Sequence, residues 1–461
     1  MCKQYFADQH DIDPNFTYLP VILGRDNPQC NAPDLKKKIQ KKATLFMLVI
    51  SLVTGILSAL VAPKIGHLSD RIGRTRLMAF VSIGGILNEI ITILAAKFPE
   101  TFDYRILILG ATFDGMTGSF TAGSILSQSY TSDSTVPSKR AVSMSYIHAC
   151  LFTGLAFGPL LAAQFVKWTG DLLIIFYIVL GCHVFFMLFC AFILPESVSK
   201  RKQLLATEHW KKMNLGRRLT TGTWIDTIRH AHPFAPLAVL WPTEPGTSKQ
   251  LRVNLVALAT TDMIIMGAMV AAGAVVVYYS ELMFNWGTVE TSRFISALSM
   301  VRVVVLMGIY PLINYFGRIR PTARRYARLG IPVTEKRAGA DRLDIWVLRV
   351  ALLSDILGGL GYVLVRTQGL FVASGMVTAV GGLGSATIQS AITKHVPPER
   401  VGQVLGAVGM LHAIGRIIGP ILFNGLYAST LETFPQAIFV LLLALFFIGF
   451  VATFFVRPHG K

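Results

Sequence analysis

The chain has 461 residues, of which 53% are hydrophobic and only 15% charged, and its mean hydropathy is +0.55. A soluble globule of this size needs more polar surface, so the composition predicts a membrane protein. The formal charge of +18 would suit a nucleic-acid partner. However, the basic residues gather between apolar runs of about 20 residues, the length that crosses a bilayer. Membrane orientation explains the charge better, and no nucleic-acid partner is expected.

Residues 1–42 are polar and contain neither a secretory signal nor a spanning segment. Two features indicate a non-cytosolic loop: the sequon that begins at Asn15, and Cys2 with Cys30, which could form a disulfide in an oxidising compartment. Sequons also arise by chance, and two cysteines can simply be free. Five lysines within 36–42 favour the opposite side of the membrane.

Eleven apolar spans follow and predict an all-α, polytopic membrane helix bundle. Their ranges are 43–64, 77–96, 105–127, 142–166, 171–194, 253–279, 294–316, 345–365, 369–393, 402–428 and 434–456. The alternate sets of loops hold 28 and 12 Lys plus Arg. The positive-inside rule therefore places the loop after the first span, the 195–252 linker and the 457–461 tail in the cytosol, and the N-terminus outside. The membrane is the plasma membrane or a vacuolar or other endomembrane.

A charged stretch follows the first span: Gly66-His-Leu-Ser-Asp70-Arg71-Ile-Gly73-Arg74. The two glycines are expected to permit a tight reversal, and Asp70 to cap the next helix and answer its positive dipole end. An ordinary solvated hairpin loop is the alternative. The stretch resembles the loop signature of the major facilitator superfamily, with a departure only at Thr75, where a basic residue is usual. The resemblance implies a secondary transporter in two six-helix halves, with this loop as a conformational switch.

In that family the signature joins helices two and three, so the eleven spans correspond to family helices 2–12. The resemblance thus predicts that the first helix is missing here, through a truncated sequence or through divergence. A second stretch, which includes Gly110, Asp114, Gly115 and Gly118, resembles the branch that contains proton-coupled folate transporter-like solute carriers and tetracycline-exporter-like drug/proton antiporters.

An internal repeat supports two pseudo-symmetric halves, 43–194 and 253–456, on either side of the linker 195–252. An offset of 261 places Gly154, Gly158 and Pro159 on Gly415, Gly419 and Pro420. Small residues four apart let helices approach closely, and proline bends a helix. The motif resembles that of exchangers and favours antiport or efflux, although a packing kink with no bearing on direction is the alternative. The second-half counterpart of the signature, Asn314 to Arg320, lacks the aspartate.

Ionisable groups inside spans are functional candidates because they are costly in hydrocarbon. The proton-coupling candidates are Asp114, His148 and Asp262, with Asp114 as the leading proton carrier and His148 as its partner. The substrate or charge-pair candidates are Arg302, Asp355, His412 and Arg416. Structural ion pairs and hydrogen-bonded histidines within the bundle are the alternatives.

The sequence therefore predicts a secondary transporter that moves a small organic solute by alternating access, coupled to protons. Two alternatives stay open: a proton symporter for an organic anion such as a folate-like solute, and a transporter-like receptor or scaffold that no longer transports. No Walker-type loop or zinc-ligand spacing is found, so an enzyme, a metal and a cofactor are not expected. The expected form is a monomer in contact with membrane lipid.

Overall fold

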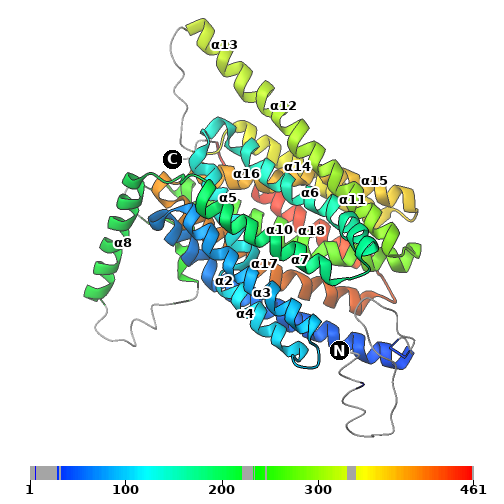
Figure 1. The fold of residues 1–461 in the computed structure, drawn as a ribbon. Helices are drawn as coiled ribbons and strands as arrows, with labels where there is room; N and C mark the ends of the chain where they lie inside the picture. Colours follow the sequence, from blue (N-terminus) through cyan, green and yellow to red (C-terminus); the bar gives the residue numbers. More distant parts are fainter. Residues whose placement is uncertain are drawn as a thin grey trace.

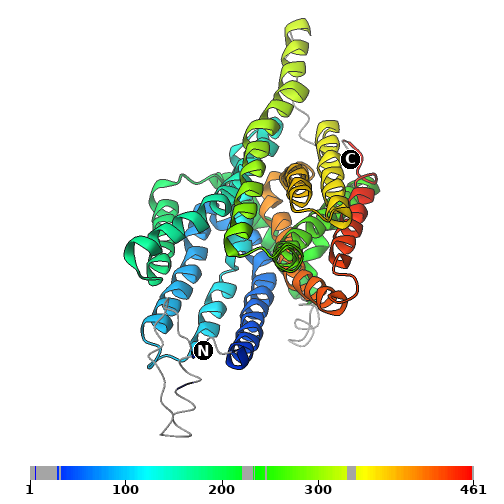
Figure 2. The ribbon, with the colours of Figure 1, turned by 90° about the vertical axis from the view of Figure 1, so that its right-hand side faces the viewer.

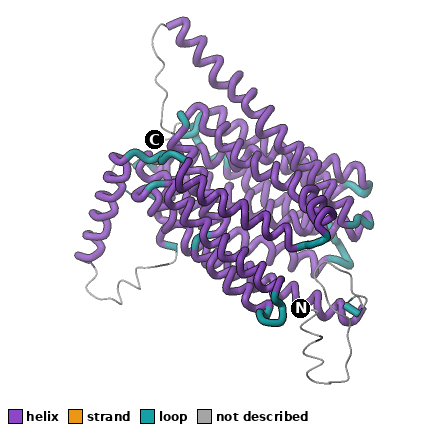
Figure 3. The backbone as a smooth tube through the Cα atoms, viewed as in Figure 1, coloured by secondary structure: helices purple, strands orange, loops and turns teal. Residues whose placement is uncertain are grey.

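The computed structural model describes residues 33–220, 234–243, 247–329 and 339–458, together with Phe6, Gln29, Cys30 and His232. Within these ranges every regular element is helical, as Figure 3 shows. Cys30 is disulfide-bonded. Asn15 and Cys2 lie outside the described residues, so the predicted glycosylation and the pairing with Cys2 stay predictions.

The first half of the bundle contains six helices and leads into a helix in the linker. They are α2 (Pro33–Ile72), α3 (Arg74–Lys97), α4 (Leu107–Met116), α5 (Ser119–Ser134), α6 (Pro137–Thr169), α7 (Leu173–Leu188) and the linker helix α8 (Lys200–Thr220). Proline at the first position of α6 suits a helix start, because its missing N–H would be unpaired there. Since α2 begins at Pro33, it extends well into the segment predicted as a loop, 1–42.

The second half begins after a short 3-10 helix, Ala235–Leu240. Its helices are α10 (Lys249–Phe284), α11 (Thr288–Val304), α12 (Tyr310–Asn314), α13 (Arg320–Leu329), α14 (Arg342–Leu364), α15 (Gln368–Thr378), α16 (Leu383–Lys394), α17 (Val401–Thr430) and α18 (Ala437–Ala452). The Ser248 hydroxyl caps α10 by accepting a 3.2 Å hydrogen bond from the Leu251 N–H. Two π-helical turns, Val305–Ile309 and Tyr315–Ile319, join α11, α12 and α13 into a rod that projects beyond the bundle (Figure 1).

Nine helices in the described ranges are long and apolar enough to cross a membrane, and α18 is a shorter apolar helix. The remaining predicted span, 105–127, is not one helix: it is divided into α4 and α5. Gly118 and Ser119 there have φ of 87° and 51°, in the left-handed region that ends an α-helix. With this correction, all eleven predicted spans have a helical counterpart.

The helices of the two halves gather on different sides of the molecule (Figure 2). The halves meet where α2 and α5 contact α17, and where α6 contacts α11 and α16. We call the end of the bundle that carries α8 and the C-terminal segment the linker end (Figure 1). The signature residues lie at this end.

Candidate functional site

The signature residues do not form the predicted loop. Helix α2 continues through Ile72, and only Gly73 separates it from α3. Gly73 has φ of 112°, so it permits the reversal alone. Gly66 instead lies inside α2 at its contact with α17, where an added Cβ would lie 2.8 Å from the Cα of Gly406. The glycine is therefore required for close approach of the two halves.

Asp70 caps a helix, but not the next one in the chain as predicted. Its Oδ1 accepts a 3.0 Å hydrogen bond from the Gly402 N–H, and its Oδ2 accepts a 2.9 Å bond from the Gln403 N–H. Both donors belong to the first turn of α17, in the other half. The carboxylate thus pairs two N–H groups that have no partner within α17 and faces the positive end of that helix dipole.

A buried arginine connects Asp70 to the rest of the first half. The Arg74 Nη2 lies 2.6 Å from the Asp70 Oδ1, and its Nε donates to the Asp133 Oδ2 at 3.0 Å. Arg74 has no exposed surface, and it also donates to the hydroxyl of Ser69. Asp133, at the end of α5, lies 3.8 Å from Lys202 Nζ of the linker helix. The guanidinium of Arg74 therefore joins α2, α3 and α5 next to the contact with α17.

Glu196 performs the capping role that was expected of Asp70. Its carboxylate accepts hydrogen bonds from the Arg74 N–H at 2.9 Å and the Thr75 N–H at 3.2 Å, at the start of α3. Burial alone would raise the pKa of Glu196, but the bonds from the backbone of Arg74, Val198 and Thr75 hold it below its ordinary value. The departure at Thr75 fits this role, because its hydroxyl donates a further hydrogen bond to Glu196, at 3.0 Å.

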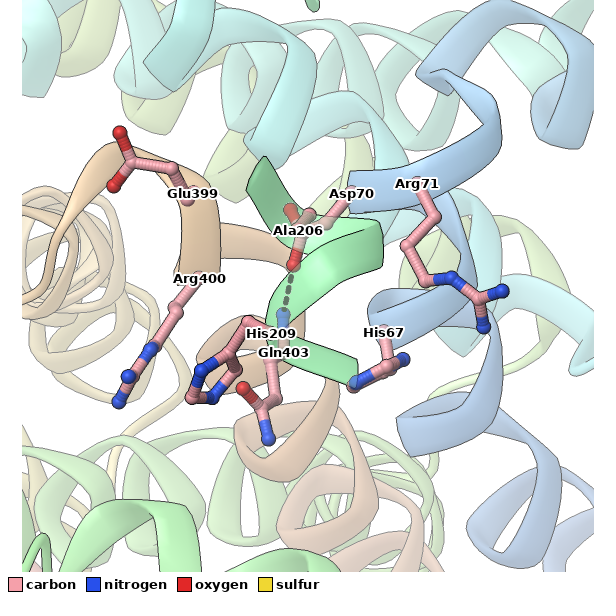
Figure 4. A pocket seen from close by; sticks show the side chains of 8 residues that line it. All are labelled: His67, Asp70, Arg71, Ala206, His209, Glu399, Arg400 and Gln403. Atoms are coloured by element: carbon pink, nitrogen blue, oxygen red, sulfur yellow. Dashed lines mark hydrogen bonds between the residues drawn. The ribbon is translucent and has the colours of Figure 1, made fainter. Parts of the chain in front are cut away.

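The contact at Asp70 encloses only a small cavity, of about 30 Å³, shown with its lining side chains in Figure 4. This volume accommodates a water molecule but not an organic solute. The linker helix covers one side of it: Ala206 is buried, and the guanidinium of Arg71 lies 3.9 Å from the ring centroid of Trp210. The two halves are thus in contact at the linker end.

The second half has a different ion network at the equivalent crossing. Arg318 takes the place of Arg74, and its Nη2 lies 2.7 Å from the Asp344 Oδ1. Lys394 Nζ lies 2.6 Å from the other oxygen of Asp344. The Nη1 of Arg318 donates to the Asn314 Oδ1 at 2.9 Å and to the Ser138 carbonyl of α6 at 3.1 Å. The aspartate missing at position 314 is therefore replaced by one on α14.

A chain of buried polar side chains links the halves deeper in the bundle. Asp262 of α10 has no exposed surface. Its Oδ2 lies 2.9 Å from His412 Nε2 and accepts a hydrogen bond from the Gln389 amide at 3.3 Å. Its Oδ1 accepts a hydrogen bond from the Ser385 hydroxyl at 2.7 Å. The Gln389 Oε1 lies 3.1 Å from the Nε2 of His148, on α6. Only His148 comes from the first half, so this contact bridges the halves.

Three of the candidate proton-coupling and charge-pair residues come together in this chain: His148, Asp262 and His412. The predicted pairing of His148 with Asp114 is wrong, since Asp114 lies instead beside Ser119 and within electrostatic range of Arg416. Ser385 and Gln389 were missed. Two polar side chains four residues apart inside an apolar span are the signal that would have found them.

Two arginines of the second half reach side chains of the first. The guanidinium of Arg302 lies 4.9 Å from the ring centroid of Phe152 on α6, and Arg416 Nη1 donates to the Thr121 hydroxyl of α5 at 3.3 Å. Asp355, another charge-pair candidate, interacts electrostatically with Arg302. Neither arginine forms a salt bridge within the described ranges.

The repeated glycine motif packs in one half only. An added Cβ at Gly415 would lie 3.4 Å from the Gly267 Cα, and one at Gly419 would lie 2.9 Å from the Gly267 carbonyl oxygen, so α17 and α10 approach closely. At Gly154 and Gly158 none of the described atoms lies within 4 Å of such a Cβ. The prolines Pro159 and Pro420 both lie inside their helices, as predicted.

These features define a polytopic helical membrane protein in two halves, with an ion-paired contact between the halves and buried ionisable groups at their interface. The family model described as the Major Facilitator Superfamily matches residues 16–332 and 340–461, and the chain belongs to this family. It is accordingly a secondary transporter of a small molecule and not an enzyme. Within the described residues, no group of three or more His, Cys, Asp or Glu side chains is arranged to hold a metal ion.

The chain is similar to the MFS-type transporter avaJ of Aspergillus versicolor, with 27% identity over 89% of this chain and 76% of the relative. It is 21% identical to the proton-coupled folate transporter of Bos taurus, over 88% of this chain and 76% of the relative. Among solved structures, the human organic anion transporter MFSD10 (TETRAN) has a TM-score of 0.65 at 17% identity, over 88% and 83% of the two chains. The expected branch of the family is confirmed.

Proposed function

We propose that the chain moves a small organic anion by alternating access, coupled to protons that bind at the Asp262–His412 pair. The observation that carries this proposal is the buried chain of contacts from His412 through Asp262 and Gln389 to His148. A relative named as proton-coupled and a structural neighbour named as an organic anion transporter support it. The linker end, which holds most of the basic residues, would face the cytosol.

A proton at this pair would change the contact between the halves. The Asp262 carboxylate accepts from three side chains in its present state: Ser385, Gln389 and His412. A proton on one carboxylate oxygen turns an acceptor into a donor, so at least one of these partners must reorient. If Gln389 reorients, its bond with His148 changes as well. Proton binding would then alter the relative free energies of the open and closed arrangements, as coupling requires.

Arg302 and Arg416 favour an anion as the solute. A cation within a membrane span is costly, and both side chains reach from the second half to the first without a salt bridge in the described ranges. Asp355 and Asp114 lie within electrostatic range of Arg302 and Arg416, but not close enough to form a salt bridge. The Nε of Arg302 is buried without a hydrogen-bond partner. A carboxylate or phosphate on the solute would supply the missing acceptor. The resemblance of the Gly154 motif to that of exchangers favours antiport over symport.

The experiment is solute-driven proton movement in proteoliposomes loaded with a pH-sensitive dye, with folate as the first organic anion tested. The wild-type protein is expected to change the internal pH when solute is added, and the sign of the change separates antiport from symport. Asp262→Asn should reduce the proton signal at least tenfold while solute exchange without a gradient continues. Asp171→Asn, an exposed loop carboxylate, is the matched control. An undiminished proton signal in Asp262→Asn would contradict the proposal.

The proposal that the solute is an anion is tested by substitution of Arg302 and Arg416. Arg302→Gln and Arg416→Gln are each expected to raise the KM for the solute about tenfold, the equivalent of one charge-assisted contact of about 1.4 kcal/mol. Arg349→Gln is the control, because Arg349 lies over the ring of Phe454 at 4.3 Å and donates to the Thr453 carbonyl, both in its own half. Equal KM values in all three variants would exclude these arginines from solute binding.

A further inference from the structure

A groove opens on the outside of the second half near the linker end. It lies between α10, α18 and Trp241, which follows the 3-10 helix Ala235–Leu240, and its volume is about 370 Å³, within the usual range for ligand sites. Its walls include Val253, Val256 and Thr260 of α10 and Ile448 and Val451 of α18. Unlike the cavity at Asp70, it contains no ionisable side chain in its lining.

The exposed apolar walls of the groove lie on two apolar helices, as expected for a surface that faces the hydrocarbon of a membrane. Its large apolar side chains are substantially exposed, with exposed fractions of 54% for Ile448, 41% for Val451 and 61% for Phe455. Val253, Val256 and Thr260 belong to α10, which is long and apolar enough to cross a membrane, and Ile448 and Val451 belong to the shorter apolar helix α18. An apolar chain of lipid would therefore enter the groove without passing through water.

A free cation stands at the linker-end mouth of the groove. Arg252 precedes Val256 by four residues, so it lies one helical turn further along the same face of α10. Its guanidinium carbon lies 5.9 Å from the ring centroid of Trp241, which also lines the groove. Arg252 forms no salt bridge in the part of the chain that the structure describes, and its Nε is buried without a partner. The positive end of the α10 dipole adds to the positive potential here.

We propose that this groove binds one phospholipid, with an acyl chain between α10 and α18 and the phosphate on Arg252. An amphiphile with an anionic head and an apolar tail matches the order of the features, because the cation lies at the linker end and the apolar walls extend from it into the membrane. An inorganic phosphate would leave the apolar walls without a partner, and a purely apolar solute would leave Arg252 without an anion. Trp241 is an amphipathic ring at this boundary, where tryptophan commonly lies in membrane proteins.

The first test counts phospholipids that stay bound to the full chain in detergent, measured by native mass spectrometry. The wild type is expected to retain one phospholipid, and Val256→Trp, which fills the groove, to retain none under the same conditions. Val350→Trp is the matched control, since Val350 is 45% exposed on α14 and lies outside the groove. Arg252→Gln should weaken anionic phospholipid binding about tenfold, and the exposed Lys211→Gln should not. Equal retention by the two tryptophan variants would overturn the proposal.

A second test does not require a variant that fills the groove. Phospholipids with brominated acyl chains quench tryptophan fluorescence on contact, and the share that belongs to Trp241 is the difference between the wild type and Trp241→Phe. This share is expected to be strongly quenched after reconstitution. If Trp241 is not quenched, the groove is not a lipid site. The same conclusion follows if the quenched fluorescence of Trp241 is restored by added folate and not by added phospholipid. Neither test depends on proton coupling, so the proposed function can fail while this site remains.

Discussion

The two halves close the linker end with different chemistry at equivalent positions. In the first half Asp70 accepts hydrogen bonds from two N–H groups of α17 and is paired with Arg74. In the second half Asn314 stands in its place, and Arg318 donates one hydrogen bond to a carbonyl of α6. The first contact is an anion at the positive end of a helix, whereas the second consists of hydrogen bonds from cations: Arg318 to the Ser138 carbonyl, and Arg140 of α6 to the Thr393 hydroxyl of α16.

This difference indicates that the two crossings contribute differently to closure of the linker end. The two bonds to Asp70 cross between the halves and are charge-assisted, so they stabilise closure directly. In the second half most of the charge pairing is internal, because Asp344 holds both Arg318 and Lys394. We therefore expect the first crossing to control the opening of the linker end and the second to stabilise the fold of its own half.

The largest effect is expected at Asp344. Asp344→Asn removes the buried carboxylate that Arg318 and Lys394 share and leaves them only the half-exposed Asp341, at 3.0 and 3.9 Å. Loss of one partner of a buried pair typically costs about 3–5 kcal/mol of unfolding free energy. The measurement is thermal unfolding in detergent, followed by fluorescence. Asn314→Asp in the same chain places a carboxylate next to Arg318 again and should recover part of the loss. If the double variant is no more stable than Asp344→Asn, a carboxylate at position 314 does not replace the one on α14.

A smaller loss of stability is expected at Asp70, because Arg74 keeps its bond to Asp133. Asp70→Asn should cost about 1–3 kcal/mol of unfolding free energy. Its effect on transport should be larger, since the contact between the halves loses its charge. Solute flux in proteoliposomes is expected to fall at least tenfold, and Asp171→Asn is again the control. Unchanged flux would show that closure does not depend on this carboxylate.

The smallest effect concerns Glu196, whose folded-state pKa lies below its ordinary value. A lowered carboxylate pKa contributes stability that is present above about pH 4.3, the ordinary value, and is lost as pH falls through the folded-state pKa. Because the side chain is exposed, we expect Glu196→Gln to cost no more than about 1 kcal/mol. Thermal unfolding from pH 6 to pH 3 should show a steeper decline for the wild type than for this variant. Parallel curves would contradict the capping role.

The sequence predicted the membrane class, the spans and the two halves, because apolar runs and loop charge report directly on the bilayer. It also identified Asp262 and His412 as ionisable groups inside spans, whereas Asp70 was expected in a loop. It could not identify the partner of Asp70, since α17 lies more than 300 residues further along the chain. The break at Gly118 was missed because hydropathy measures the length of an apolar run and not its backbone conformation.

The claim that Asp70 holds the linker end closed is tested most directly by the distance between the halves at that end. Spin labels at Ser134 and Arg457, both exposed, would be placed in a chain whose free cysteines Cys150, Cys182 and Cys190 are replaced by alanine, and measured by pulsed electron spin resonance. We expect a mainly short distance in this background, a shift to a longer distance in Asp70→Asn, and little change in Asn314→Ala. A distance distribution in Asp70→Asn that matches the background chain would contradict the claim.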